Sequence, residues 1–264
     1  MDLGLKGKRA LVTGSTAGIG LAAARALAAE GAEVTVNGRT QARVDAAVRQ
    51  IESEVPGAVV AGVAADLGTA EGCEAMVQAR PEVDVLVNNL GIFEVRTFSE
   101  ITDADWMRFF ETNVLSGVRL SRAYVEGMRS RGWGRIVFVS SESALQIPAE
   151  MIHYGMTKTA QLAVARGLAE TLAGTGVTVN CVLPGPTASE GLTGFVAGQA
   201  EQRGVDAATV EREFFQHARP SSILQRFETP EEIASMIAYL CGVPASGTTG
   251  AAVSVDGGTV RAIG

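Results

Sequence analysis

Tyr154 and Lys158 stand four residues apart, and a serine pair, Ser140 and Ser141, lies thirteen to fourteen residues upstream. On a helix, side chains at positions i and i+4 share a face, so the phenol and the ammonium would point the same way. A free tyrosine has a pKa of about 10, but a cation about 5 Å away, at an effective dielectric of about 20, favours the phenolate by roughly 3 kcal/mol. This would lower the pKa by about two units, into the range of general acid–base catalysis. The same spacing also occurs where a packed ring merely lies beside a solvated amine.

Length and composition restrict the class of protein. The chain has 264 residues, 47% of them hydrophobic, enough for one large α/β domain over 1–264 with a single core. The net charge of −7, without a basic run, argues against nucleic acid or an anionic membrane as the main partner. Three scattered cysteines without metal-ligand spacing indicate thiols in a reducing compartment and no metal site. The first residues do not resemble a signal peptide, and glycines and a proline break the charge-free stretch 233–255, so we expect a cytoplasmic protein without membrane spans.

Short apolar runs rich in valine and isoleucine alternate with longer helix-period segments. The expected strands are 9–13, 33–37, 59–64, 83–88, 135–140, 177–182 and 252–256. The expected helices lie near 18–30, 41–54, 70–79, 103–131, 152–174 and 229–241. This alternation predicts βαβ units, and therefore a doubly wound parallel sheet with helices on both faces.

The segment between the last two strands breaks this rhythm. It is far longer than an ordinary crossover and contains Phe195, Phe214, Phe215 and Phe227. Long inserts at the strand ends of open α/β sheets commonly cover the ligand crevice. We therefore predict that 186–228 is a substrate lid, with a packing or oligomer contact as the alternative.

A glycine-rich turn follows the first expected strand and opens the first expected helix. Glycines allow a tight turn close to a diphosphate, and a helix N-terminus supplies free N–H groups and a partial positive charge. The glycine spacing differs from the common dinucleotide fingerprint, but its position predicts nucleotide binding. The residues of this turn are Gly14, Ser15, Thr16, Gly18, Ile19 and Gly20.

Further motifs follow in order along the chain from about Leu5 to Gly264. They are Asp66 and Leu67, the run 88–91, Asn113, Ser141, Tyr154 with Lys158, the pair 184–185 and the closing run 255–258. With these residues the chain resembles an ordinary-length short-chain dehydrogenase/reductase, similar to the 3-oxoacyl-carrier-protein reductases. The resemblance implies a single-domain Rossmann-type sheet of seven strands, with the site at the carboxyl ends of the strands.

The resemblance also implies cofactor contacts. Asp66 would accept a hydrogen bond from the adenine amino group, and the Leu67 backbone would meet the ring. Asn89 and Gly91 would lie on the ribose side, whereas Asn88 would be structural. The nicotinamide carboxamide would meet the backbone at Thr187, and a hydroxyl would follow at Ser189.

The same resemblance assigns the catalytic roles to four residues. Tyr154 would exchange a proton with the substrate oxygen, which Ser141 rather than Ser140 would hold by a hydrogen bond. Lys158 would lower the tyrosine pKa and hold the nicotinamide ribose. Asn113 would distort its helix and hold a water that connects Lys158 to solvent.

The end of the second expected strand bears on the choice between NADP and NAD. An acidic residue there would bind the ribose hydroxyls and repel a 2′-phosphate. This chain has Gly38, Arg39 and Thr40 instead, and a guanidinium beside a hydroxyl suits a phosphate. We therefore favour NADP(H), with NAD(H) as the alternative.

Some residues near the motifs are expected to have no catalytic role. His153 points about 100° away from Tyr154 on a helix and is expected to line the substrate pocket or to pack. Glu142 is expected to be solvated or bonded to its loop, and Glu150 and Glu190 to be solvated. With few charges expected near the site, the lid favours a carbonyl compound with an apolar portion.

Two function classes follow. The first is an NADP(H)-dependent oxidoreductase that acts on a ketone or secondary alcohol, such as an oxoacyl thioester, a small ketone, a sugar or a steroid. The second is a non-catalytic sensor of the NADPH/NADP balance, which the presence of Tyr154, Lys158 and Ser141 disfavours. The resemblance also implies a homodimer or homotetramer through the helices near 103–131 and 152–174 and through the last helix and strand.

Overall fold

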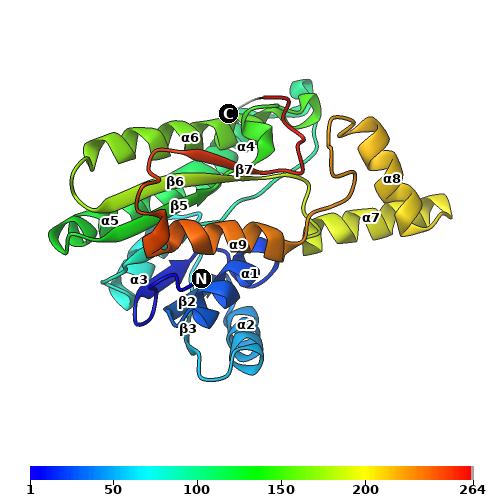
Figure 1. Ribbon diagram of the computed structural model, residues 1–264. Coiled ribbons are helices and arrows are strands. Elements are labelled where there is room, and N and C mark those ends of the chain that lie inside the picture. The colour runs from blue at the N-terminus through cyan, green and yellow to red at the C-terminus, as the bar shows by residue number, and fades with distance from the viewer. Residues whose placement is uncertain (263–264) are drawn as a thin grey trace.

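The computed structural model describes residues 1–262, and its centre is a seven-stranded, entirely parallel sheet (Figure 1). The strand order is β3-β2-β1-β4-β5-β6-β7, so the chain reverses its direction of travel across the sheet between β1 and β4. The predicted doubly wound fold is confirmed. The strands are β1 (Arg9–Val12), β2 (Glu33–Gly38), β3 (Val59–Ala64), β4 (Val85–Asn88), β5 (Gly134–Val139), β6 (Val177–Pro184) and β7 (Ala252–Val255).

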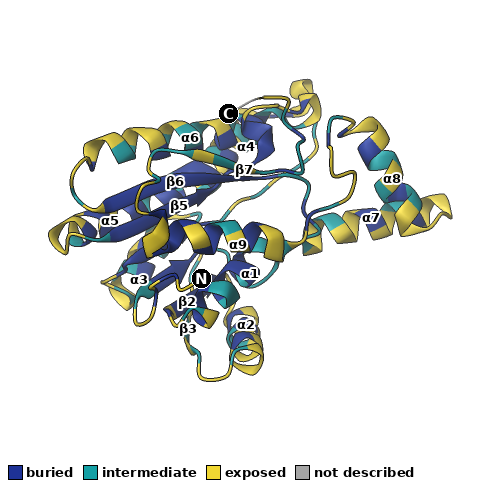
Figure 2. Cartoon of the chain, viewed as in Figure 1, coloured by how far each residue is buried: buried dark blue, intermediate teal, exposed yellow. Residues whose placement is uncertain are grey.

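Helices cover both faces of the sheet, because its central strands are apolar on both sides. Every residue of β4, β5 and β6 is buried. One face packs against α1 (Gly18–Ala29), α2 (Gln41–Glu54) and α9 (Pro230–Cys241). The other packs against α3 (Ala70–Ala79), α5 (Ser116–Ser130) and α6 (Ile152–Thr171). Figure 2 shows the buried strands between helices whose outer faces are exposed.

The helix expected over 103–131 is interrupted. It begins as α4 (Asp103–Phe110), which Thr102 and Asp105 cap reciprocally. It then passes through a π-helical segment, Glu111–Leu115, before continuing as α5. A π turn inserts an extra residue and reorients side chains locally. The segment contains Asn113, at which a distortion was expected.

The insert 186–228 contains two helices that the sequence analysis did not identify. They are α7 (Glu190–Arg203), which ends at Gly204 in the left-handed conformation, and α8 (Ala207–His217), which Asp206 caps. The rings of Phe214, Phe215 and Phe227 pack together, with centroids 5.1–5.2 Å apart. Figure 1 shows both helices projecting beyond the sheet.

Two further properties concern the residues that the structure describes. No helix within 1–262 combines the length and the apolar character that crossing a membrane requires. Cys73, Cys181 and Cys241 are all buried as free thiols.

Asn37, near the end of β2, holds the glycine-rich turn against the sheet. Its Oδ1 accepts a hydrogen bond from the Gly14 N–H at 3.1 Å, and its Nδ2 donates to the carbonyls of Val63 and Ala65 at 3.2 and 3.1 Å. Its backbone N–H donates to the Ser15 hydroxyl at 2.9 Å. Asn37 is 2% exposed, so water cannot readily replace these partners.

We predict that Asn37→Ala lowers the free energy of unfolding by about 3 kcal/mol, because three partly buried backbone groups lose their partner. Urea titration measures this loss. Thr40→Ala is the control, because Thr40 is exposed and its side chain makes no capping bond, and it should cost less than about 0.5 kcal/mol. Equal losses in the two variants would contradict the role of Asn37.

Candidate active site

The phenol and the amine of the predicted pair lie on one side of the first turns of α6. Lys158 Nζ is 5.5 Å from the centre of the Tyr154 ring and donates to the Val139 carbonyl, at the end of β5, at 2.9 Å. A Cβ placed on Gly91 would lie 3.4 Å from Nζ, so the amine also approaches the loop after β4. An ammonium has three donors, which leaves N–H groups for a bound cofactor.

Burial dominates the electrostatics of this pair. Lys158 is 4% exposed, and desolvation lowers its pKa to about 8. Burial raises the pKa of Tyr154 above its usual range, although a hydrogen bond with Ser141 lowers it. Burial therefore outweighs the lowering of the tyrosine pKa that was expected from Lys158, because the sequence argument included the attraction of the cation but not the loss of solvation. The phenol is neutral at neutral pH, the form that can donate a proton.

The two serines after β5 have different partners. The Ser140 hydroxyl donates to the Lys158 backbone carbonyl at 2.9 Å, which fixes α6 to the strand end. The Ser141 hydroxyl donates to the Glu142 carboxylate and accepts a hydrogen bond from the Ser143 N–H at 3.1 Å. Ser141, and not Ser140, is the serine whose side chain hydrogen-bonds to Tyr154 and so lowers the pKa of the phenol.

Of the two expected alternatives for Glu142, a solvated and a loop-bonded carboxylate, the structure shows the second, because the buried side chain bonds to Ser141 in its own loop. It is 4% exposed, and its second oxygen pairs with Arg219 Nε at 3.0 Å. Arg219 follows α8, so the contact joins the insert to the residue beside Ser141. No sequence pattern indicates this contact, because the two residues are 77 positions apart.

Asn113 connects three parts of the site from within the π-helical segment. Its Oδ1 accepts from the Ile92 N–H at 2.8 Å, while its Nδ2 donates to the Ile92 carbonyl and to the Thr157 hydroxyl, each at 3.0 Å. Its own carbonyl accepts from Gln161 Nε2 at 2.6 Å. Asn113 thus joins the loop after β4 to α6, beneath Lys158.

The glycine-rich turn has the geometry that a diphosphate site needs. Gly14 has a φ of +59°, and a Cβ on Gly20 would come within 2.5 Å of the Gly14 carbonyl, so neither position accepts a larger residue without strain. The first N–H groups of α1 have no side-chain cap from Ala17. Such uncapped N–H groups bind anions.

Side chains of the turn have structural roles. The Ser15 hydroxyl is fully buried and donates to the Val12 carbonyl at 2.6 Å. Asn89 Nδ2 donates to the carbonyls of Thr13 and Gly14 at 2.9 and 3.0 Å, so Asn89 holds the turn from the neighbouring strand. Asn88 instead donates to the Ser121 hydroxyl at 3.2 Å.

The remaining predicted cofactor residues follow β2, β3 and β6. Arg39 and Thr40 are exposed, and Arg39 forms no ion pair with any residue in 1–262. Asp66 is exposed and accepts from the Gly68 N–H at 3.0 Å, whereas Leu67 is buried. The Thr187 hydroxyl donates to the Gly185 carbonyl at 2.9 Å.

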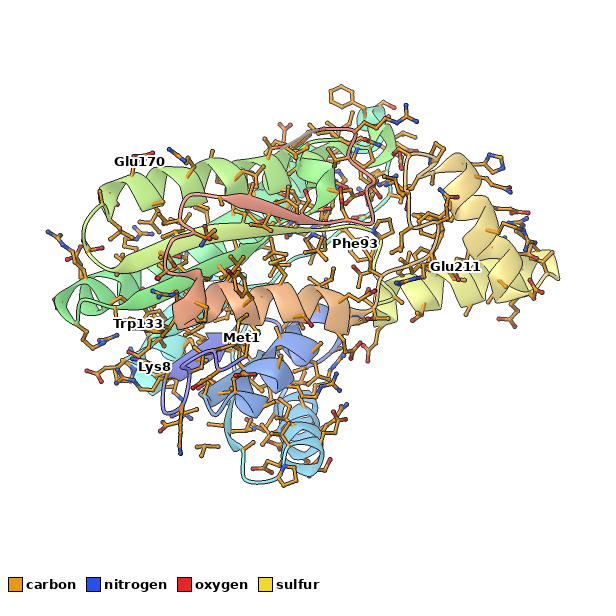
Figure 3. All side chains as sticks on the ribbon, viewed as in Figure 1. Met1, Lys8, Phe93, Trp133, Glu170 and Glu211 are labelled. Carbon is orange, nitrogen blue, oxygen red and sulfur yellow. The ribbon has the colours of Figure 1, made fainter. Side chains whose placement is uncertain are left out.

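A cavity of about 500 Å³ lies at the carboxyl ends of the strands and extends to the insert. Figure 3 labels Phe93 beyond the strand ends, on the side of α7 and α8, and Glu211 on α8. The wall of the cavity includes the predicted residues Ile19, Asn89, Gly91, Ser141, Tyr154, Lys158, Thr187 and Ser189. The other predicted site residues lie outside this wall: Gly14, Ser15, Thr16, Gly18, Gly20, Arg39, Thr40, Asp66, Leu67 and Asn113.

His153 packs and does not line the cavity. It is fully buried, its ring centre is 4.0 Å from that of Phe109, and neither ring nitrogen has a hydrogen-bond partner among residues 1–262. Burial lowers its pKa, so the ring is neutral. Glu190 is exposed and pairs with Arg43 at 2.9 Å.

Comparison with known proteins agrees with this geometry. The sequence model of the family described as short chain dehydrogenase matches residues 8–199. The chain belongs to the short-chain dehydrogenase/reductase family. It is therefore an NAD(P)-dependent oxidoreductase, as the sequence predicted.

Individual relatives cover nearly the whole chain. The chain is 46% identical over 263 residues to the uncharacterized oxidoreductase YvaG of Bacillus subtilis, with 100% of both chains covered. It is 34% identical over 260 residues to the D-beta-hydroxybutyrate dehydrogenase of Cupriavidus necator, covering 97% of this chain and 99% of the relative. Among solved structures, L-sorbose reductase from Gluconobacter frateurii, complexed with NADPH and L-sorbose, matches with a TM-score of 0.94 and 33% identity over 100% of both chains.

The burial of Lys158 predicts a stability effect that depends on pH. Its folded pKa of about 8 lies below an unfolded value of about 10.4, so between these values the unfolded chain binds more protons and rising pH stabilises the fold. Lys158→Met should raise the free energy of unfolding at pH 7. Between pH 7 and 9.5 the wild type should recover roughly 2 kcal/mol relative to the variant.

Urea unfolding of both proteins at the two pH values measures this difference. Lys6→Met is the matched control, because Lys6 is exposed. A Lys158→Met variant that is less stable than wild type by the same amount at both pH values would refute the desolvation argument.

Proposed function

We propose that the protein is an NADP(H)-dependent reductase or dehydrogenase that acts on a ketone or the corresponding secondary alcohol, with Tyr154 as the general acid and base. The observation that carries the proposal is that Tyr154, Ser141 and Lys158 line one cavity with Ile19, Asn89 and Gly91 from around the glycine-rich turn. A sensor without catalysis would not need a buried amine beside a neutral phenol.

The residues present fit a dinucleotide. The uncapped N-terminus of α1 and the tight turn at Gly14 would hold the diphosphate. The exposed guanidinium of Arg39 and the hydroxyl of Thr40 would hold the 2′-phosphate of NADP(H), and the related L-sorbose reductase is complexed with NADPH. When bound, the cofactor supplies or accepts the hydride.

The protein's own contribution concerns the proton and the orientation of the substrate. Tyr154 would donate its phenolic proton to the carbonyl oxygen during reduction, or accept the hydroxyl proton during oxidation. Ser141 would fix that oxygen beside the phenol. Lys158 would stabilise the phenolate that remains after the transfer, through the charge it carries below a pKa of about 8.

Other expectations belong to the same proposal. The segment 186–228 would act as a lid, because residues of α7 and those following α8 form part of the cavity wall. Asp66, Leu67, Thr187 and Ser189 would complete the cofactor site. The protein would act as a dimer or a tetramer.

Tyr154→Phe tests the catalytic role. The substitution removes the transferred proton but retains the ring, so kcat/KM for NADPH-dependent reduction across a panel of ketones should fall by about 1,000-fold. The Kd for NADPH, followed by its fluorescence, should change by less than about threefold. A wild-type protein that binds NADPH tightly but reduces no carbonyl compound would instead support the sensor.

Arg39→Ala tests the choice of cofactor. Loss of a charge-assisted bond to the 2′-phosphate should weaken NADPH binding by about 10- to 100-fold and leave NADH binding almost unchanged. Arg43→Ala is the control from the first turn of α2, because Arg43 already pairs with Glu190. Equal losses of NADPH and NADH affinity in Arg39→Ala would rule out the phosphate contact.

A further inference from the structure

Three charged side chains from separate segments meet on one wall of the cavity. Glu142 follows β5, Glu150 lies in the short helix Ala149–Met151, and Arg219 follows α8. Arg219 Nε lies 3.0 Å from Glu142 Oε1, and its Nη1 lies 3.8 Å from Glu150 Oε1. The Arg219 and Glu142 side chains are only 10% and 6% exposed, whereas that of Glu150 is 49% exposed.

Hydrogen bonds within the protein use only some of the N–H donors of the Arg219 guanidinium. Nε bonds to Glu142, and Nη1 donates to the Ala218 carbonyl at 2.8 Å. Within residues 1–262, Nη2 has no hydrogen-bond partner, although Arg219 lines the cavity. A purely apolar substrate would remove water from this group without replacing its hydrogen bond, which is unfavourable for binding.

The charges on this wall distinguish between polar substrates. Two carboxylates face one guanidinium, and the Lys158 amine instead donates to the Val139 carbonyl. A substrate carboxylate would add a third negative charge close to Glu142 and Glu150, and like charges at short range repel. A neutral hydroxyl can both accept from Arg219 and donate to Glu150.

The position of the guanidinium is fixed. The Phe214 ring lies 6.0 Å from Arg219 Cζ and belongs to the aromatic cluster of the insert. Glu142 accepts the Ser141 hydroxyl on one oxygen and Arg219 on the other. The group that would meet the substrate hydroxyl is thus separated from Ser141 by a single carboxylate.

We propose that Arg219 and Glu150 recognise a hydroxyl group of the substrate, so that the enzyme acts on neutral hydroxyketones in preference to plain ketones or keto acids. Glu142 is the positioning residue, since it holds Arg219 and Ser141 at a fixed separation. This inference rests on the proposed function, because Tyr154 and Ser141 define the carbonyl end of the substrate.

Three small ketones with a common methyl ketone group test the proposal: 4-hydroxy-2-butanone, 2-pentanone and acetoacetate. With NADPH and the wild-type enzyme, kcat/KM should be about tenfold or more higher for the hydroxyketone than for 2-pentanone, and lowest for acetoacetate. Equal values for the three compounds, or a preference for acetoacetate, would overturn the hydroxyl site but leave the proposed oxidoreductase intact. Absence of turnover with every carbonyl compound would overturn the proposed function itself.

Variants test which residues cause the preference for the hydroxyketone. In Arg219→Gln the ratio of kcat/KM for 4-hydroxy-2-butanone to that for 2-pentanone should fall towards one, and Arg219→Lys should retain part of it. In Glu150→Gln the discrimination against acetoacetate should weaken, because one repelling charge is removed. Both ratios compare two substrates on one protein, so partial unfolding does not affect them.

Arg212→Gln is the matched control, an exposed arginine of α8 that bonds to Thr209. It should retain the wild-type ratios. If the ratios of Arg219→Gln equal those of the wild type, Arg219 does not recognise the substrate and the inference is wrong.

Discussion

The side chains of the site come together because seven parallel strands end at the same edge of one sheet. In a parallel sheet every strand presents its carboxyl end to that edge, and the crevice opens where the strand order reverses. Here the reversal lies between β1 and β4, beside the glycine-rich turn. The ends of β5 and β6 then bring Ser141 and Thr187 to the same cavity. Without the parallel register these residues, scattered over most of the chain, would share no surface.

Desolvation determines the electrostatic state of the site more than the attraction between neighbouring charges does. Within the described part of the chain, Lys158 donates to one acceptor, the Val139 carbonyl, and it remains largely shielded from water. The Glu142–Arg219 pair is similarly enclosed, and breaking such a pair leaves an uncompensated buried charge. The chain therefore keeps ionisable groups in places where apolar residues would pack better. Such a loss of stability is common where function requires it.

The sequence was most informative where function depends on local spacing. The turn from Gly14 to Gly20 and the pair Tyr154 and Lys158 are each contained in one strand–helix junction or one helix, and the alternation of elements predicted the sheet. The sequence was least informative where segments that are distant along the chain come into contact. Nothing in the sequence around Glu142 indicates a partner in the insert. Helix α7 lacks a clear apolar period, whereas α8 has an apolar face and the Asp206 cap, a signal that the sequence analysis overlooked. The burial that raises the pKa of Tyr154 also arises only when the chain is packed.

The π-helical segment has a consequence for the loop that leaves β4. Through one side chain, Asn113 offers an acceptor to the Ile92 N–H and a donor to the Ile92 carbonyl. In a sheet, the N–H and C=O of one residue bond to the backbone of the adjacent strand in the same way. The Asn113 amide therefore supplies the donor and the acceptor that a backbone peptide group would supply. Ile92 is thereby held almost as if the sheet continued past Asn88. A carboxylate could only accept, and a hydroxyl would have to donate and accept through a single oxygen, so an amide, with its donor and acceptor on separate atoms, suits this position best.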